Sequence, residues 1–78
     1  MMRTYYSRLT PHQQEQAKET AYTYSSRYVF AAFRDMFVYA SDAERHYLKP
    51  YDLGRCMEDI SIMIAALEIQ ADVHIPRT

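Results

Sequence analysis

The sequence of 78 residues has few of the residues that turn or cross-link a chain. It contains one glycine, three prolines, one cysteine and no tryptophan. A fold rich in β-strands needs many tight turns, which depend on glycine and proline, so this composition favours an all-α protein. The single glycine also excludes a glycine-rich loop for binding phosphate groups.

The lone cysteine, Cys56, excludes a disulfide within the chain and fits a reducing compartment, so we expect a cytoplasmic protein. His12, His46 and His74 are too widely spaced to form a metal site, and we expect neither a metal nor another cofactor. No apolar run approaches the roughly 20 residues that cross a bilayer, and the first residues do not resemble a signal peptide. We therefore expect no membrane partner.

Residue patterns typical of enzymes are scarce as well. Cys56 lies among apolar residues, where a buried and inert thiol is more frequent than a nucleophile. The neighbouring acids Glu58 and Asp59 are explained by the polar face of a helix. We therefore predict no catalytic residues and a protein that is not an enzyme.

The charge of the chain argues against nucleic acid as the first choice of partner. The net charge is −1, whereas a nucleic-acid-binding domain is expected to be basic. Residues 3–8, "RTYYSR", nevertheless interleave two arginines with two aromatic rings, as proteins that bind single strands do. Residues 1–34 are mainly basic and residues 56–73 carry only acids, so the two halves can attract each other within one chain or between copies.

Capping signals indicate where helices begin. Thr10, Pro11 and Gln13 form a capping box with a first-turn proline, which predicts a long helix over residues 11–40. Ser41 and Glu44 form a second box, which predicts a new helix that starts at residue 42.

The remaining boundaries complete a fold of three helices. Pro50 ends the second helix, so it covers residues 42–49, and Asp52 caps a third helix over residues 52–73. We predict a single helical domain over residues 1–78, built as a small three-helix bundle. Residues 1–10 form an N-terminal arm that is either extended or a frayed helical turn, and residues 74–78 form a short tail.

The long helix is unevenly apolar. Residues 27–40, "RYVFAAFRDMFVYA", spread their apolar side chains over roughly 200° of the helix, wider than the stripe of an ordinary surface helix. Residues 11–26 are polar nearly all round. Either the chain bends at Ser25 and Ser26, or the helix is straight and its first half is exposed.

The third helix carries apolar residues on two opposite faces. One face, the predicted core face, consists of Leu53, Met57, Ile60, Ile64, Leu67 and Ala71. The other contains Ile62, Ile69 and Val73, and three helices cannot cover both faces. We therefore expect a second polypeptide to cover this second face, most simply in a homodimer. The residues predicted for self-association are Phe30, Phe37, Ile62, Ile69 and Val73.

Eight tyrosines are more than a small core can bury. Tyrosine is enriched in protein-binding surfaces, although a tyrosine at the rim of a core also satisfies its hydroxyl in water. Arginines beside these rings add the second residue type of binding hot spots. The predicted partner-binding residues are Arg3, Tyr5, Tyr6, Arg8, Tyr22, Tyr24, Arg27 and Arg34.

These features are typical of a small binding protein whose protein target the sequence does not identify. We expect an inhibitor or adaptor that occupies a surface of a larger macromolecular complex. Phage and mobile-element inhibitors of host defence, such as anti-CRISPR proteins, have a similar size and composition, which is an analogy only. The alternatives are a nucleic-acid-binding regulator that uses arginines and tyrosines, and a small-ligand sponge that holds a nucleotide in a pocket between protomers.

Overall fold

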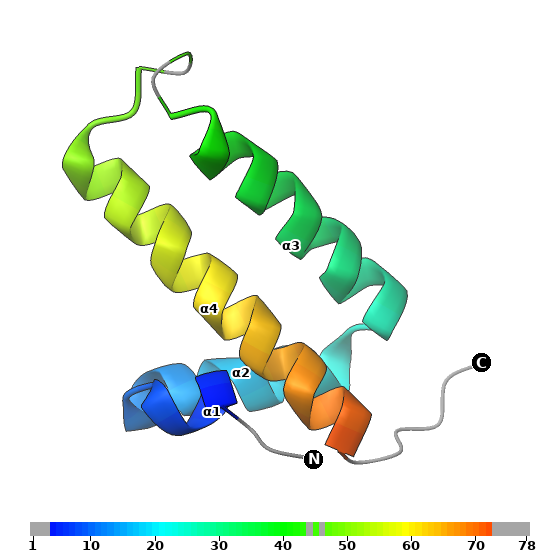
Figure 1. Ribbon diagram of the computed structural model, residues 1–78. Coiled ribbons are helices and arrows are strands. Elements are labelled where there is room, and N and C mark those ends of the chain that lie inside the picture. The colour runs from blue at the N-terminus through cyan, green and yellow to red at the C-terminus, as the bar shows by residue number, and fades with distance from the viewer. Residues whose placement is uncertain (1–3, 44, 46, 73–78) are drawn as a thin grey trace.

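The computed structural model describes residues 4–43, 45 and 47–72. In this part of the chain all regular structure is helical, as the composition predicts. The helices are α1 (Thr4–Arg8), α2 (Pro11–Thr23), α3 (Ser26–Ser41) and α4 (Pro50–Asp72). Figure 1 shows α3 and α4 as an antiparallel hairpin, with α1 and α2 lying across the C-terminal half of α4. Helix α4 contacts each of the other three helices.

Helix α2 begins where the sequence predicts. The Oγ1 atom of Thr10 accepts a hydrogen bond from the Gln13 backbone N–H at 3.2 Å. The Gln13 side chain in turn accepts one from the Thr10 backbone N–H at 3.0 Å, which completes the capping box. Pro11 occupies the first helical turn, where it lacks only an N–H that would have no partner within the helix.

The predicted long helix over residues 11–40 is wrong as a continuous element. Tyr24 and Ser25 have extended backbone angles, and they separate α2 from α3. Ser25 caps α3 by accepting from the Tyr28 N–H at 3.2 Å. The Gln70 amide of α4 donates to the carbonyls of Ala21 at 3.1 Å and Tyr24 at 2.9 Å, so it satisfies the end of α2. The chain therefore bends beside the predicted pair Ser25 and Ser26.

The predicted short helix over residues 42–49 does not form. Asp42 is instead the C-cap of α3, and the described residues of the segment lie in turns or irregular backbone. Tyr47 has a left-handed backbone with a φ of 55°, which a helix interior excludes. A segment of eight residues offers too few hydrogen bonds to offset the cost of helix nucleation. The other half of the predicted capping box, Glu44, lies outside the described residues.

Pro50 starts the last helix rather than ending the one before it. The Lys49 carbonyl accepts the first bond of α4 from the Leu53 N–H at 2.9 Å. Asp52, which was predicted as the cap, lies within the first turn, where its charge favours the positive end of the helix dipole. The proposed end at Val73 lies outside the described residues.

The N-terminal arm is helical over Thr4–Arg8. The Glu68 carboxylate of α4 accepts hydrogen bonds from the backbone N–H groups of Tyr5 and Tyr6 at 3.0–3.1 Å. The first N–H groups of any helix are not used by its own ladder of hydrogen bonds, so Glu68, 62 residues away from Tyr6 in the sequence, caps the start of α1. Of the two alternatives for the arm, the helical turn is correct for these residues.

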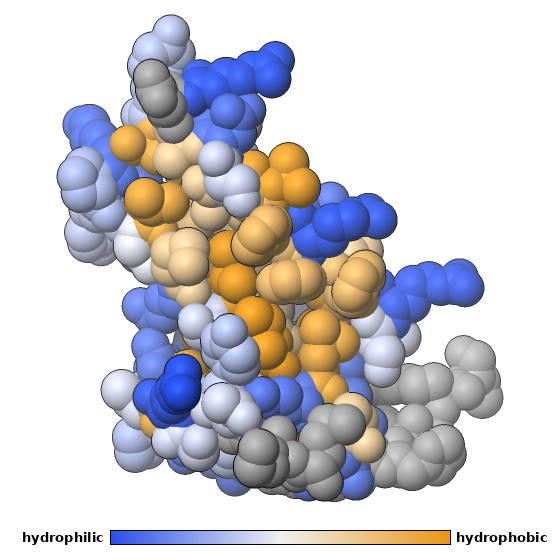
Figure 2. All heavy atoms as spheres, in the orientation of Figure 1, coloured by the Kyte–Doolittle hydropathy of each residue, from blue (hydrophilic) through white to orange (hydrophobic). Residues whose placement is uncertain are grey.

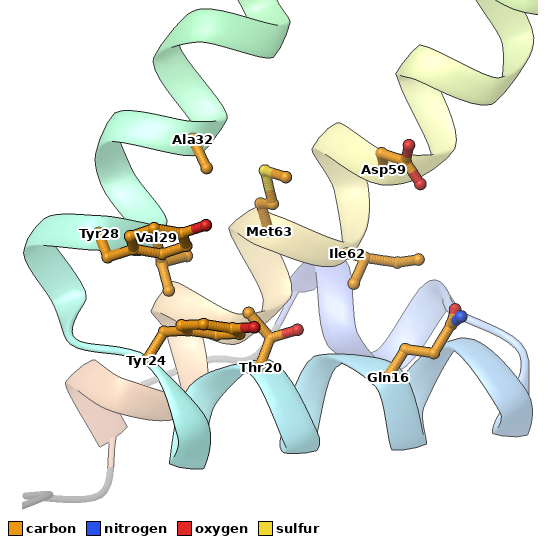
Figure 3. A pocket seen from close by; sticks show the side chains of 9 residues that line it. All are labelled: Gln16, Thr20, Tyr24, Tyr28, Val29, Ala32, Asp59, Ile62 and Met63. Atoms are coloured by element: carbon orange, nitrogen blue, oxygen red, sulfur yellow. The ribbon is translucent and has the colours of Figure 1, made fainter.

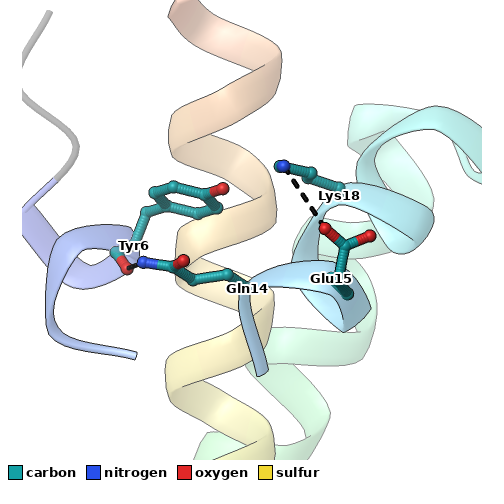
Figure 4. A network of polar contacts seen from close by, with 4 residues as sticks. All are labelled: Tyr6, Gln14, Glu15 and Lys18. Carbon is teal, nitrogen blue, oxygen red and sulfur yellow. Dashed lines mark hydrogen bonds and ion pairs between the residues drawn. The ribbon is translucent and has the colours of Figure 1, made fainter. Parts of the chain in front are cut away.

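Tyr6 also joins α1 to α2. Its carbonyl accepts a hydrogen bond from the Gln14 side-chain amide at 3.0 Å (Figure 4). Within α2, the Glu15 carboxylate lies 3.4 Å from the Lys18 ammonium. The Tyr6 hydroxyl and then the Glu15 carboxylate raise the pKa of Lys18, because both interactions favour its charged form. The first turns of α2 are therefore engaged with α1 rather than extending alone into solvent.

The core lies where α2 crosses α4. Its buried residues are Ala17, Ala21, Val29, Ile62, Ala65, Ala66 and Ile69. Four of these seven are alanines, and such small side chains allow two helices to approach closely. Tyr6, Leu9, Met63 and Leu67 are partly buried against this core.

The face of α4 that is buried differs from the predicted core face. Ile62 and Ile69, predicted for self-association, are only 8% and 2% exposed, because the break at Tyr24 lets α2 fold over them. On the predicted core face Ile60 is buried, but Met57 and Ala71 are exposed. The argument that three helices leave Ile62 and Ile69 uncovered is therefore wrong.

Replacing Glu68 by alanine should release α1. Hydrogen bonds to a charged group contribute about 1.5–3 kcal/mol, and partial exposure places this loss near the lower value. Denaturant unfolding of Glu68→Ala, with Glu58→Ala as the exposed control on the same helix, measures the difference. Equal stability of the two variants would contradict a role of Glu68 in holding α1.

Ile69→Asp should unfold the protein rather than dissociate a dimer. The change removes about 2–5 kcal/mol of apolar packing and buries a charge as well, which is comparable to the whole stability of a small domain. Circular dichroism should show loss of helix, whereas the exposed control Val38→Asp should remain folded. A helical Ile69→Asp variant would show that this position is not in the core.

Candidate interaction site

The end of the hairpin farthest from α1 and α2 has few buried residues. The main core cluster extends no farther along α4 than Ile62, and beyond it only Ala40 and Ile60 are buried. Figure 2 shows hydrophobic side chains gathered over α3 and α4 and bordered by hydrophilic ones. Exposed apolar patches of this kind mark binding surfaces more often than scattered single residues do.

One flank of α3 carries a row of three phenylalanines, which we call the phenylalanine ridge: Phe30, Phe33 and Phe37. Their spacing of three and four residues places them on one side of the helix. The ring centroids lie 6.1 Å apart for Phe30 and Phe33 and 5.9 Å apart for Phe33 and Phe37, in tilted arrangements. Phe30 and Phe37 are 53% and 51% exposed, so the ridge presents a preformed aromatic surface.

The opposite flank of α3 faces two hollows that meet. The first, which we call the cleft, has a volume of about 310 Å³, and the second, the depression, about 440 Å³. Both hollows share Ala32 and Met63 in their lining, so together they form a groove between α3 and α4. At 100° per residue, Tyr28 and Phe37 lie on opposite sides of α3, so the groove and the ridge face different directions.

The cleft combines an apolar floor with a polar rim. Its lining residues are Gln16, Thr20, Tyr24, Tyr28, Val29, Ala32, Asp59, Ile62 and Met63. Figure 3 shows the two tyrosines together at one end, with their hydroxyls directed toward the interior of the cleft, and Gln16 and Asp59 at the other end. The rings of Tyr24 and Tyr28 are stacked, with centroids 4.7 Å apart and an interplanar angle of 17°. This stack forms a firm wall across the break between α2 and α3.

The depression lies farther along the hairpin and is almost wholly apolar. It is lined by Ala32, Asp35, Met36, Tyr39, Cys56 and Met63. Cys56 is half-buried and borders this hollow, so the expectation of a fully buried core thiol is only partly met. Methionine side chains adapt to irregular partners, and the two in this lining suit a hollow that receives another molecule.

The charge of the groove is negative. Its fully charged residues are Asp35 and Asp59, and neither lining includes a lysine or an arginine. Asp35 has a base nearby, since the Arg34 Nε atom lies 3.6 Å from its carboxylate, but both side chains are largely exposed. Arg55 lies one turn before Asp59 on α4. A hydrogen bond with Tyr51 is the main cause that raises the pKa of Arg55, and Asp59 adds to it.

The predicted partner-binding residues do not converge on one surface. Tyr5 and Arg8 are exposed on α1, Tyr22 is exposed on α2, and Arg27 and Arg34 are exposed on α3. Tyr6 is half-buried against the core, and Arg3 lies outside the described residues, as does Val73 of the self-association set. Of the predicted set, Tyr24 is the residue that lines the groove.

Sequence reasoning missed most of the cleft. Gln16, Asp59 and Met63 come from helices that the sequence does not place side by side, and no local motif links them. The spacing of Tyr24 and Tyr28 by four residues is the one local signal, and in the predicted continuous helix it would place the two rings on one face. The stacked pair forms instead across the end of one helix and the start of the next.

Other kinds of site receive no support from the described residues. Within residues 4–43, 45 and 47–72, no three metal-ligating side chains gather into a cluster. None of the four described helices combines the length and the apolar character needed to cross a membrane.

Comparisons with known proteins define no relative for this chain. It matches no protein-family profile, and neither a curated protein nor a solved structure shows significant similarity to it. Arguments about function therefore depend on the geometry and chemistry of its own surfaces.

Proposed function

We propose that this protein is a non-enzymatic binding protein, an inhibitor or adaptor that acts by occupying a protein surface of a larger complex. The observation that carries the proposal is the α3–α4 hairpin, which exposes aromatic side chains on both flanks of α3. Rigid aromatic side chains supply contact area at a low cost in conformational entropy, which favours binding. On so small a protein, several exposed aromatic side chains close together form an apolar patch, and such a patch indicates a surface that another molecule covers.

The phenylalanine ridge supports self-association. Phe30 and Phe37 remain from the predicted self-association set, whereas Ile62 and Ile69 are removed from it because they are core residues. A two-helix hairpin with one apolar flank can pair with a second copy to form a four-helix arrangement around a twofold axis. Both rings are already half-buried in the single chain, so covering the rest of each contributes about half of the 1.5–3 kcal/mol of a complete burial, and other contacts between the copies must add to it.

The class of target remains a proposal by analogy. The single thiol, the small size and the wealth of tyrosine suit a cytoplasmic inhibitor of a macromolecular complex. Phage or mobile-element inhibitors of host defence, of the anti-CRISPR type, are such proteins. The analogy suggests a small protein that inhibits a complex by binding to it. The groove and the phenylalanine ridge are the surfaces proposed to contact the target.

The double variant Phe30→Ser/Phe37→Ser should be monomeric and should keep its helical content. Both side chains are half exposed, so their loss removes the proposed dimer contact while sparing the core. Sedimentation velocity measures the mass, and thermal unfolding at matched concentration checks the fold. Val38→Ser, an equally exposed change away from the ridge, is the control. A wild-type protein that sediments as a monomer at high concentration would exclude self-association through the ridge.

Nucleic-acid binding is expected to be absent at moderate salt. Arg27 and Arg34 are exposed on α3, but the adjoining groove is acidic and would repel phosphates. Fluorescence anisotropy with single-stranded and duplex oligonucleotides, titrated with salt, tests this expectation. Tight binding that weakens steeply with salt would favour the nucleic-acid-binding regulator instead.

The nucleotide sponge is the less suitable of the two alternatives. The cleft of the single chain is lined by tyrosines and an aspartate without an arginine. A nucleotide carries phosphates, which need positive groups or a cluster of backbone N–H donors. The observed lining therefore suits a cation better than a nucleotide.

A further inference from the structure

We propose that the cleft between α2, α3 and α4 binds an arginine side chain that a partner protein presents. The inference rests on the proposed function in one respect, because the partner supplies the arginine. The cleft itself is present in the single chain and can be tested without any partner. Three features of its lining lead to this class of ligand: its size, its hydrogen-bonding groups and its charge.

The size and floor of the cleft suit one long side chain. Its volume of about 310 Å³ lies at the lower end of the range for small-ligand sites. Val29, Ile62 and Met63 form an apolar floor, and the methylene stem of an arginine packs well on such a surface. The stacked rings of Tyr24 and Tyr28 close one end, so the stem has a wall to pack against.

The polar rim of the cleft can offer several acceptors. Asp59 supplies two carboxylate oxygens, Gln16 an amide oxygen, and Thr20 and Tyr28 hydroxyl oxygens. A guanidinium group has five N–H donors in a fixed plane and no acceptor. In Figure 3, Asp59 on α4 and Gln16 on α2 both lie on the side of the cleft away from the two tyrosines, with Ile62 between them. A lysine ammonium is a compact point charge and would use these separated acceptors less completely.

The charge of the cleft selects a cation. Asp59 is the one fully charged residue in its lining, and it is half-buried, so its field is less screened than that of a surface carboxylate. Within the described residues no ion pair satisfies Asp59 directly, and Arg55 acts on it only as a nearby charge while its hydrogen bond goes to Tyr51. An incoming guanidinium can therefore form the direct, charge-assisted contact that Arg55 does not make.

The neighbouring depression extends the recognition to the rest of the partner segment. It continues from the cleft through Ala32 and Met63, and its lining is apolar apart from Asp35 at the edge. A partner segment with an arginine next to apolar residues would therefore match the whole groove. A phosphate-bearing or acidic partner would place like charges beside Asp35 and Asp59.

The test uses N-acetyl-arginine-N-methylamide as the probe and the citrulline analogue as its neutral match. In ¹H–¹⁵N NMR titrations of the wild-type protein, the arginine probe should shift the amides of Thr20, Tyr28, Ile62 and Met63 in a saturable manner. The citrulline probe has nearly the same shape without the charge and should bind about tenfold more weakly or not at all, a difference expected when a charged contact is lost. Equal binding of both probes, or shifts elsewhere on the protein, would overturn the proposal.

Two variants locate the charge. Asp59→Asn should weaken binding of the arginine probe about tenfold while the spectrum retains its dispersion. Asp52→Asn, on the same helix but outside the lining of the cleft, should leave binding unchanged. Undiminished binding to a folded Asp59→Asn variant would also overturn the proposal. If the lysine analogue bound more tightly than the arginine probe, the preferred ligand of the cleft would be an ammonium group, and the proposal of an arginine would be wrong.

The test separates this inference from the proposed function. If no probe binds while Phe30→Ser/Phe37→Ser still abolishes self-association, the cleft proposal fails and the binding function stands. If the free probe binds but an arginine-containing peptide does not, the cleft takes a small guanidinium compound rather than a protein side chain, and the proposed partner is wrong. Binding of both, with loss on Asp59→Asn, supports the proposal as stated.

Discussion

The fold depends on the close packing of α2 against α4 through alanines. Ala17 and Ala21 meet a surface of α4 that contains Ala65 and Ala66, and all four are fully buried. Small side chains allow the helices to approach, and Ile62 and Ile69 then fill the space on either side. This contact is possible only because the chain bends at Tyr24 and Ser25, where Gln70 satisfies the carbonyls that the end of α2 exposes. One crossing therefore determines which face of α4 is inside.

The same crossing explains why the rest of the hairpin is exposed. Helices α1 and α2 cover only the C-terminal half of α4, so the far half of the α3–α4 hairpin has no third layer among the described helices (Figure 1). The phenylalanine ridge lies on one flank of α3. The groove on the other flank runs from this uncovered half toward the crossing with α2, where the cleft is lined by the core residues Val29 and Ile62. A small domain buries only part of its apolar surface, and the part that stays exposed is available to a partner. The core and the proposed binding surface adjoin in this short chain, because Val29 and Ile62 belong to both.

The sequence predicted some elements well because their signals are local. The capping box at Thr10 and Gln13 requires only residues three apart, and α2 begins there. The density of apolar residues in 27–40 predicted a helix with more apolar surface than one face, and α3 spans these residues with several of its aromatic side chains exposed. The capping box at Ser41 failed because a short helix needs tertiary contacts to persist, and the described residues of this segment form a turn instead. A local signal thus favours a helix but does not decide whether it forms.

By itself the sequence determined the all-α class, the start of α2 and the excess of aromatic side chains over what a small core holds, since each follows from composition or short spacing. Tertiary structure decided which apolar face of α4 is buried, and it alone assembled the cleft from Gln16, Tyr28 and Asp59. The physical reason is that both faces of α4 have similar periodicity, so the pattern cannot rank them. The face that is buried is instead decided by the direction of α2 relative to the break at Tyr24 and Ser25. That direction is set by the two hydrogen bonds from Gln70 and by the packing of the alanines, which are contacts between residues more than 40 positions apart.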